Sequence, residues 1–258
     1  MQNAQKVIVV SHGGIPHADD ILALAIAKAL GAETARVEDA KLVEFVAQKV
    51  REGYVVLVVD VGANMYEQLK AIDPTKVFVV DHHGVGRDAE YATASAVAKI
   101  FGVELPRHVL EFIDKTDIGK FTDVRNIAEQ EMYGNTFVTR FNVEPKTREE
   151  AEALLKALAE VTPADKLAAL QIVARKVAQV DPKLLDPVMP DVAAIRHYVE
   201  GNTARAKELV EKYRLSGVGL SPLDYAYYKL KGPAEFEKAV DRGLADRLKA
   251  LQLVQEGK

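Results

Sequence analysis

Carboxylates and imidazoles gather at the ends of three short apolar runs in this sequence. They are His12, His17, Asp19 and Asp20 in VIVVSHGGIPHADD, Asp60 in VVLVVDVG, and Asp81, His82 and His83 in KVFVVDHHG. Imidazole nitrogen and carboxylate oxygen together suit Mn²⁺, Fe²⁺, Co²⁺ or Zn²⁺ better than Ca²⁺, which prefers oxygen alone. The chain has no cysteine, so thiolate ligands are excluded. These residues therefore predict a site for divalent metal ions.

The placement of the histidines separates this hypothesis from a chance distribution of polar residues. One strand that ends in Asp-His-His would decide nothing, because strands commonly end in polar residues. Four of the six histidines, however, lie at two of these run ends. The other two, His108 and His197, fall in helical patterns and are expected to be surface or packing residues. The concentration indicates that one edge of the fold presents ligands.

The elements that must position these residues alternate along the first part of the chain. Strand-like runs occupy residues 6–12, 34–39, 54–62 and 76–83, and helical patterns occupy 18–32, 39–53 and 65–72. Continuous apolar strands separated by helices are typical of a parallel sheet buried on both faces. Ligands of such a sheet bind beyond the carboxyl ends of its strands. The sequence thus predicts an α/β fold, a mainly parallel sheet with helices on both faces.

The number of candidate ligands indicates two ions. They exceed what one ion requires, and crowded carboxylates repel one another unless a pair of cations offsets their charge. Two metals roughly 3.5–4 Å apart can clamp the attacking and leaving oxygens of a phosphoryl displacement. Hydrolysis of a phosphoester or phosphoanhydride is the reaction that this arrangement favours.

Four ordered motifs resemble those of a known superfamily. VVSHGGIPHADD, VVDVG, VVDHHG and FIDKTDIG look like the motifs of the DHH phosphoesterases, which include RecJ-type exonucleases, oligoribonucleases, cyclic dinucleotide phosphodiesterases and manganese pyrophosphatases. ATASAVAKIFG also resembles the helix that follows the DHH motif there. The resemblance covers about residues 5–120. It departs from the common pattern at His17, where the superfamily usually has an aspartate, a variation that resembles one branch of the superfamily.

The resemblance implies a role for each motif residue. His12 and His17 would bind one metal, Asp19 and His82 the other, and Asp60 would join both. Of the fourth motif, Asp117 is the preferred ligand because it precedes the turn-forming Ile-Gly, and His83 would contact the scissile phosphate. The cofactor implied is a pair of divalent ions, Mn²⁺ first, with Mg²⁺, Co²⁺ or Zn²⁺ as alternatives.

Five further residues are open between a functional and a structural role. Asp81 is expected to orient a histidine rather than bind metal. Asp20 is either a ligand or a structural carboxylate, since an acidic residue is also favoured at a helix start. Asp114 is likewise open, because its i, i+3 spacing from Asp117 could point both carboxylates at one site. Arg87 and Lys120 are candidates to hold phosphate oxygens, although a single basic residue is more often merely solvated.

The second half of the chain has a different texture. From residue 146 onward the patterns are almost purely helical, so we expect a DHH-like metal-binding domain over 1–125, a linker over 126–145 and a helical domain over 146–258. The Gly-rich GGGH signature that many DHH enzymes carry in a C-terminal domain does not occur. The tyrosines of SPLDYAYYKLKG are expected to pack a helix rather than stack on bases.

Two functions from different classes follow. The first is a metal-dependent phosphoesterase acting on a phosphorylated small molecule or a short oligonucleotide. The alternative is a catalytically degenerate DHH-fold protein that serves as a binding or assembly component, a hypothesis motivated by His17 and the missing GGGH. A net charge of −4 gives no global basic footprint, and no apolar run is long enough for a membrane partner. A cytoplasmic location is expected, whereas substrate and oligomeric state are not readable.

Overall fold

The computed structural model describes residues 5–14, 16–83, 90–117, 143–185, 188–215 and 219–257. These residues divide into two compact units. The first contains the residues up to 117 together with Glu144–Leu155, and the second contains Val143 and the residues from Lys156 onward. Of the linker predicted over 126–145, only 143–145 are described.

A four-stranded sheet forms the centre of the first unit. The strands are β1 (Val7–His12), β2 (Glu33–Val37), β3 (Val55–Val59) and β4 (Val77–Val80), in the order β2-β1-β3-β4. All three strand pairs are parallel. The predicted class, a mainly parallel α/β sheet followed by a mostly helical part, is confirmed.

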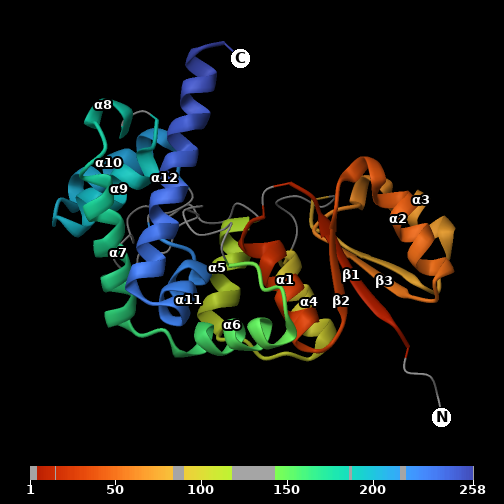
Figure 1. Ribbon diagram of the computed structural model, residues 1–258. Helices are drawn as coiled ribbons and strands as arrows, with labels where there is room; N and C mark the ends of the chain where they lie inside the picture. The colour runs from red at the N-terminus through yellow and green to blue at the C-terminus, as the bar shows by residue number, and fades with distance from the viewer. Residues whose placement is uncertain are drawn as a thin grey trace. The chain divides into compact units, whose positions relative to one another are not determined.

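Helices cover both faces of this sheet. They are α1 (Ala18–Ala29), α2 (Asp39–Arg51), α3 (Tyr66–Ile72), α4 (Thr93–Phe101) and α5 (Arg107–Asp117), with a short 3-10 helix, η1 (Ala63–Met65), before α3. α2 and α3 pack on one face and α1 and α4 on the other, with α5 against α4 and α1 (Figure 1). Alternate strand side chains enter the two cores: Ile8 and Val10 join the cluster beneath α2 and α3, and Val9, on the opposite face, is equally buried.

The strand order creates a natural binding edge. From β1 the chain passes through α1 to β2 on one side, then returns past β1 through α2 to β3 on the other. The connections that leave β1 and β3 therefore lie on opposite faces, and a crevice opens between the carboxyl ends of these two neighbouring strands. His12 ends β1 and Asp60 follows β3, so both lie at this crevice.

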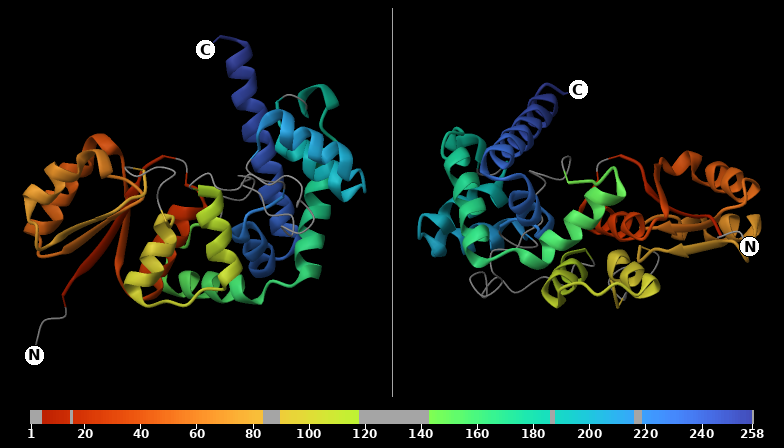
Figure 2. Two further views of the ribbon diagram at one scale, coloured as in Figure 1. Left: turned by 180° about the vertical axis from the view of Figure 1, so that it is seen from behind. Right: turned by 60° about the horizontal axis from the view of Figure 1, so that its bottom comes forward.

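The second unit is helical. It contains α7 (Pro163–Val177), α8 (Pro182–Leu185), α9 (Pro190–Val199), α10 (Thr203–Tyr213), α11 (Pro222–Lys231) and α12 (Pro233–Gln255), and α6 (Arg148–Glu160) is divided between the two units. α7 packs against α9, α11 and α12, and α9 packs against α10 (Figure 2). Tyr225 and Tyr227 of α11 are buried, as expected for tyrosines that pack a helix. Among the described helices, none is long and apolar enough to cross a membrane.

Candidate metal centre

Asp60 lies at the middle of the carboxyl edge of the sheet. Its backbone N–H donates to the Val80 carbonyl at 3.0 Å, which fixes the end of β3 against β4. Its φ of 58° lies in the left-handed region, which aspartate adopts more readily than most residues. The side chain is buried, and its Oδ2 has no hydrogen-bond partner among the described residues. A buried carboxylate oxygen without a donor is costly unless a cation meets it.

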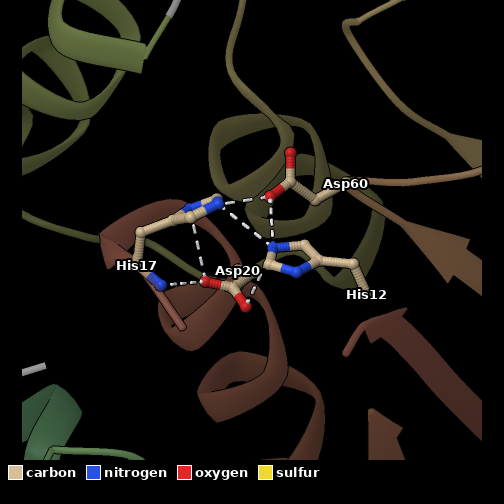
Figure 3. Close-up of side chains that lie close together, drawn as sticks. All are labelled: His12, His17, Asp20 and Asp60. Atoms are coloured by element: carbon tan, nitrogen blue, oxygen red, sulfur yellow. Dashed lines mark hydrogen bonds and ion pairs between the residues drawn. The ribbon is translucent and has the colours of Figure 1, made fainter. Parts of the chain in front are cut away.

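One group of ligand atoms forms between β1 and β3. It comprises His12, His17, Asp20 and Asp60, whose side chains converge in Figure 3. The Nε2 atoms of His12 and His17 lie 3.1 Å apart, and His12 Nε2 is 3.6 Å from Asp60 Oδ2. His12 Nδ1 donates to the Gly13 carbonyl at 2.7 Å, because a carbonyl can only accept. That bond leaves the lone pair of a neutral His12 on Nε2, the atom that faces the group.

Asp20 belongs to this group by position, but other partners already hold its oxygens. Oδ2 forms an ion pair with Arg36, and Oδ1 accepts the backbone N–H of His17 at 2.7 Å. Asp20 is fully buried, so the guanidinium neutralises a charge that burial would otherwise make costly. Of the two roles left open by the sequence, this geometry favours an orienting carboxylate over a ligand.

A second group shares Asp60 and lies between the sheet and α4. It comprises Asp19, Asp60, His82 and Asp117, and the ligand atoms all lie within 4.8 Å of one another. His82 Nε2 is 2.8 Å from Asp117 Oδ2, and His82 Nδ1 is 3.7 Å from Asp60 Oδ1. α5 thus brings Asp117 back to the strand end, 35 positions after His82.

Asp19 is held by the first turn of α4. Its oxygens accept the backbone N–H groups of Thr93 at 3.1 Å and of Ala94 at 2.7 Å. Each carboxylate oxygen keeps a second lone pair, so these bonds orient Asp19 without excluding an ion. Burial raises the pKa of the Asp19 carboxyl well above its ordinary value, and the charges of Asp60 and Asp117 raise it further. A bound cation would offset both effects.

His83 and Asp81 form a pair at the mouth of the centre. The Asp81 carboxylate contacts His83 Nδ1, accepts the His83 backbone N–H at 3.1 Å, and accepts the Ala63 N–H at 3.0 Å. Asp81 therefore has the geometry of a residue that orients a histidine. The His83 side chain is 59% exposed, unlike that of His82, which is buried.

A cavity of about 790 Å³ opens over this edge. His12, His17, Asp60 and His83 line it from the centre, and Glu38, Asp39 and Asn64 line it from α2 and η1. Its volume is that of a pocket for a small ligand. The described residues that line it include no lysine or arginine, so the positive charge an anionic ligand needs would come from bound ions and imidazoles.

Asp114 has a structural partner. Its Oδ1 accepts the backbone N–H of Ala92 at 2.8 Å, just before α4. Asp117, one turn later on α5, contacts His82 instead. The i, i+3 spacing therefore does not direct both carboxylates to one ion.

We expect Asp114→Ala and Asp117→Ala to differ in their effects. Asp114→Ala leaves the buried Ala92 N–H without an acceptor, so it should lower the free energy of unfolding by about 1–3 kcal/mol while metal content stays unchanged. Asp117→Ala should reduce metal content. Chemical denaturation and elemental analysis of both variants measure the contrast, and loss of metal from Asp114→Ala would contradict the assignment.

Sequence reasoning missed Arg36 and Thr93. Arg36 lies at the carboxyl end of β2, so the strand-end rule that found His12 would also have found it. The Thr93 hydroxyl lies 3.1 Å from His82 Nδ1 and donates to Asp60 Oδ1 at 3.4 Å, contacts for which the sequence gives no signal. Arg87 and Lys120, the candidates for phosphate contacts, lie outside the described residues.

A cation that binds at the centre competes with a proton on His12. The Asp60 carboxylate raises the pKa of His12 to about 9; burial opposes this, and the Gly13 carbonyl and the Asp20 charge add to it. Because the pKa is raised, His12 stabilises the metal-free fold below its ordinary value of 6.5, and that contribution is lost as the pH rises through about 9.

Binding of Mn²⁺ should therefore tighten as the pH rises toward 9 and release at least one proton per protein at pH 7, since a ligating imidazole must be neutral. Calorimetric titration in two buffers with different ionisation heats measures the proton count. Thermal unfolding should shift upward with added Mn²⁺, because the ion binds only the folded state. A titration that releases no proton at pH 7 would contradict the role of His12.

Comparisons of the chain with protein-family models, with curated proteins and with solved structures found no match. The geometry of the site shows buried His and Asp groups that could hold divalent metal ions.

Proposed function

We propose that this protein is a metal-dependent phosphoesterase that hydrolyses a phosphodiester or a small phosphorylated substrate with two divalent cations. The observation that carries the proposal is the position of Asp60. Its carboxylate belongs to all three His/Asp groups found among the described residues, including the two described above, and one of its oxygens is buried without a hydrogen-bond partner among those residues. One carboxylate between two ligand sets is the arrangement of a two-ion centre. The resemblance of the four motifs to the DHH phosphoesterases adds support.

Each residue of the centre would have a separate role. When bound, a pair of divalent cations activates water and offsets the charge of a phosphoryl group. Asp60 would hold both ions, with His12 and His17 on one side and Asp19, His82 and Asp117 on the other. His83, oriented by Asp81 at Nδ1, would donate a hydrogen bond from Nε2 to the phosphate in its doubly protonated form. Asp20, which forms an ion pair with Arg36, would accept the backbone N–H of His17 and so keep His17 in position.

The cavity favours a small substrate or the end of a short oligonucleotide. A volume of about 790 Å³ admits a ligand of roughly dinucleotide size. Glu38, Asp39 and Asn64 can accept hydrogen bonds from hydroxyl or amino groups of such a ligand. A long polyanion would meet carboxylates on this wall.

The proposal is tested by hydrolysis assays on the full chain after chelation and re-addition of Mn²⁺, Co²⁺, Zn²⁺ or Mg²⁺. The substrates are short RNA, single-stranded DNA, cyclic dinucleotides, pyrophosphate and nucleoside phosphates. We expect at least one to be hydrolysed, and only with a divalent ion present. A protein that binds the ions yet hydrolyses none of the panel would overturn the proposal and favour the binding-component alternative.

A further inference from the structure

The two ligand groups that share Asp60 differ in chemistry. The imidazole half, His12 and His17, offers two imidazole nitrogens, which bind a cation as uncharged ligands once any proton is released. The carboxylate half, Asp19, His82 and Asp117, offers two carboxylates and one imidazole. Asp60 counts in both halves, and Asp20, which lies near the imidazole half, is held by Arg36. The first half therefore has one available carboxylate and the second has three. Imidazole suits Zn²⁺ and its neighbours in the transition series, whereas carboxylate suits Mg²⁺ and Mn²⁺.

Arg36 maintains this difference. Asp20 is close enough to serve the imidazole half, with Oδ2 3.4 Å from His12 Nε2. However, both Asp20 oxygens are engaged, Oδ2 by the ion pair with Arg36 and Oδ1 by the His17 N–H. The Arg36 side chain is only 15% exposed. A carboxylate held by a guanidinium and a backbone N–H is less free to turn toward a metal ion. The imidazole half therefore stays poor in carboxylate.

The distances in the imidazole half fit a single ion. Two nitrogens bound at about 2.0–2.1 Å to one ion in tetrahedral or octahedral geometry lie roughly 2.9–3.4 Å apart. The Nε2 atoms of His12 and His17 are 3.1 Å apart. Asp60 Oδ2, buried and without a hydrogen-bond partner among the described residues, lies beside both rings, 3.6 Å from His12 Nε2 and 3.8 Å from His17 Nδ1. It is the oxygen that a cation in this half would satisfy.

We propose that the centre is heterobinuclear, with Zn²⁺ in the imidazole half and Mn²⁺ in the carboxylate half. The inference rests on the proposed two-ion centre and specifies its metals. Zn²⁺ binds most protein sites more tightly than Mn²⁺, so the property that distinguishes the halves is the ratio of the two affinities. That ratio should be larger where imidazole replaces carboxylate.

The test is a competition between the two ions. Crystals of the full chain are equilibrated with fixed Mn²⁺ and increasing Zn²⁺, and anomalous scattering at the two absorption edges identifies the ion in each half. We expect Zn²⁺ to replace Mn²⁺ in the imidazole half at a Zn²⁺/Mn²⁺ ratio at least about tenfold lower than in the carboxylate half. Elemental analysis in solution should show the same two steps. The inference would be overturned if Zn²⁺ replaced Mn²⁺ in both halves at the same ratio, or in the carboxylate half first.

A matched pair of variants locates the cause. His17→Asp replaces one imidazole of the imidazole half by a carboxylate. The Zn²⁺/Mn²⁺ ratios at which the two halves exchange their ions should then lie about tenfold closer to each other than in the wild type. His197→Asp makes the same change on α9 in the helical unit and should leave both steps unchanged. If His17→Asp still folds and binds two ions but keeps the wild-type difference, the donor-set argument is wrong.

The competition also separates this inference from the proposed function. Two different ions in a protein that hydrolyses nothing on the panel would sustain the inference and overturn the function. Phosphoester hydrolysis by a centre whose halves show equal selectivity would do the reverse.

Discussion

Asp60→Asn is expected to abolish metal-dependent hydrolysis and to release ions from both halves of the centre. Loss of one charge-stabilising donor typically costs 10²–10³-fold in turnover, and loss of the ligand that both ions share should cost at least about 10³-fold. Metal content by elemental analysis and turnover of any substrate found on the panel measure the two effects. The upward shift of thermal unfolding by Mn²⁺ should also disappear.

The choice of asparagine follows from the backbone at this position. Asp60 has a φ of 58°, a conformation that asparagine tolerates and alanine adopts less readily. Asp60→Asn therefore removes the charge and keeps the shape of the strand end, so a folding defect should not obscure the result. Asp73→Asn, in the turn between α3 and β4, is the matched control and should bind metal as the wild type does. A variant Asp60→Asn that retained both ions would rule out a bridging role.

Much of this centre could be predicted because it follows from topology. Parallel strands place their carboxyl ends at one edge, so His12, Asp60 and His82 had to meet once the Val and Ile runs were recognised as strands. The structure places His12 in one group of possible metal ligands and His82 in another, and Asp60 belongs to both groups.

The remainder depends on register and rotation, which a single sequence does not reveal. Arg36 meets Asp20 because β2 pairs with β1 so that Ser11 lies opposite Arg36. Asp117 rather than Asp114 reaches His82 because of how α5 is rotated against α4. In the helical unit, the spacing of apolar residues predicts the helices and carries no information about a ligand.

His83→Ala is expected to lower turnover by about 10²–10³-fold without emptying the centre, the scale of losing one donor to a charged transition state. The Asp81 carboxylate accepts from Nδ1 of this ring, so the doubly protonated ring offers its Nε2–H to a phosphate in the cavity. His83→Gln restores one side-chain N–H donor and should recover part of the turnover. Turnover and elemental analysis on the same preparations give both readouts.

The position of His83 makes the opposite outcome meaningful. Asp60, Asp81, His82 and His83 also place ligand atoms within 4.8 Å of one another, so the geometry alone would permit His83 to bind an ion. Two observations favour the phosphate role: His83 is more exposed than the residues of the two halves, and its Nδ1 is already engaged by Asp81. If His83→Ala lost one ion per protein and His83→Gln did not restore it, His83 would be a ligand, and the phosphate would have to be bound by other residues.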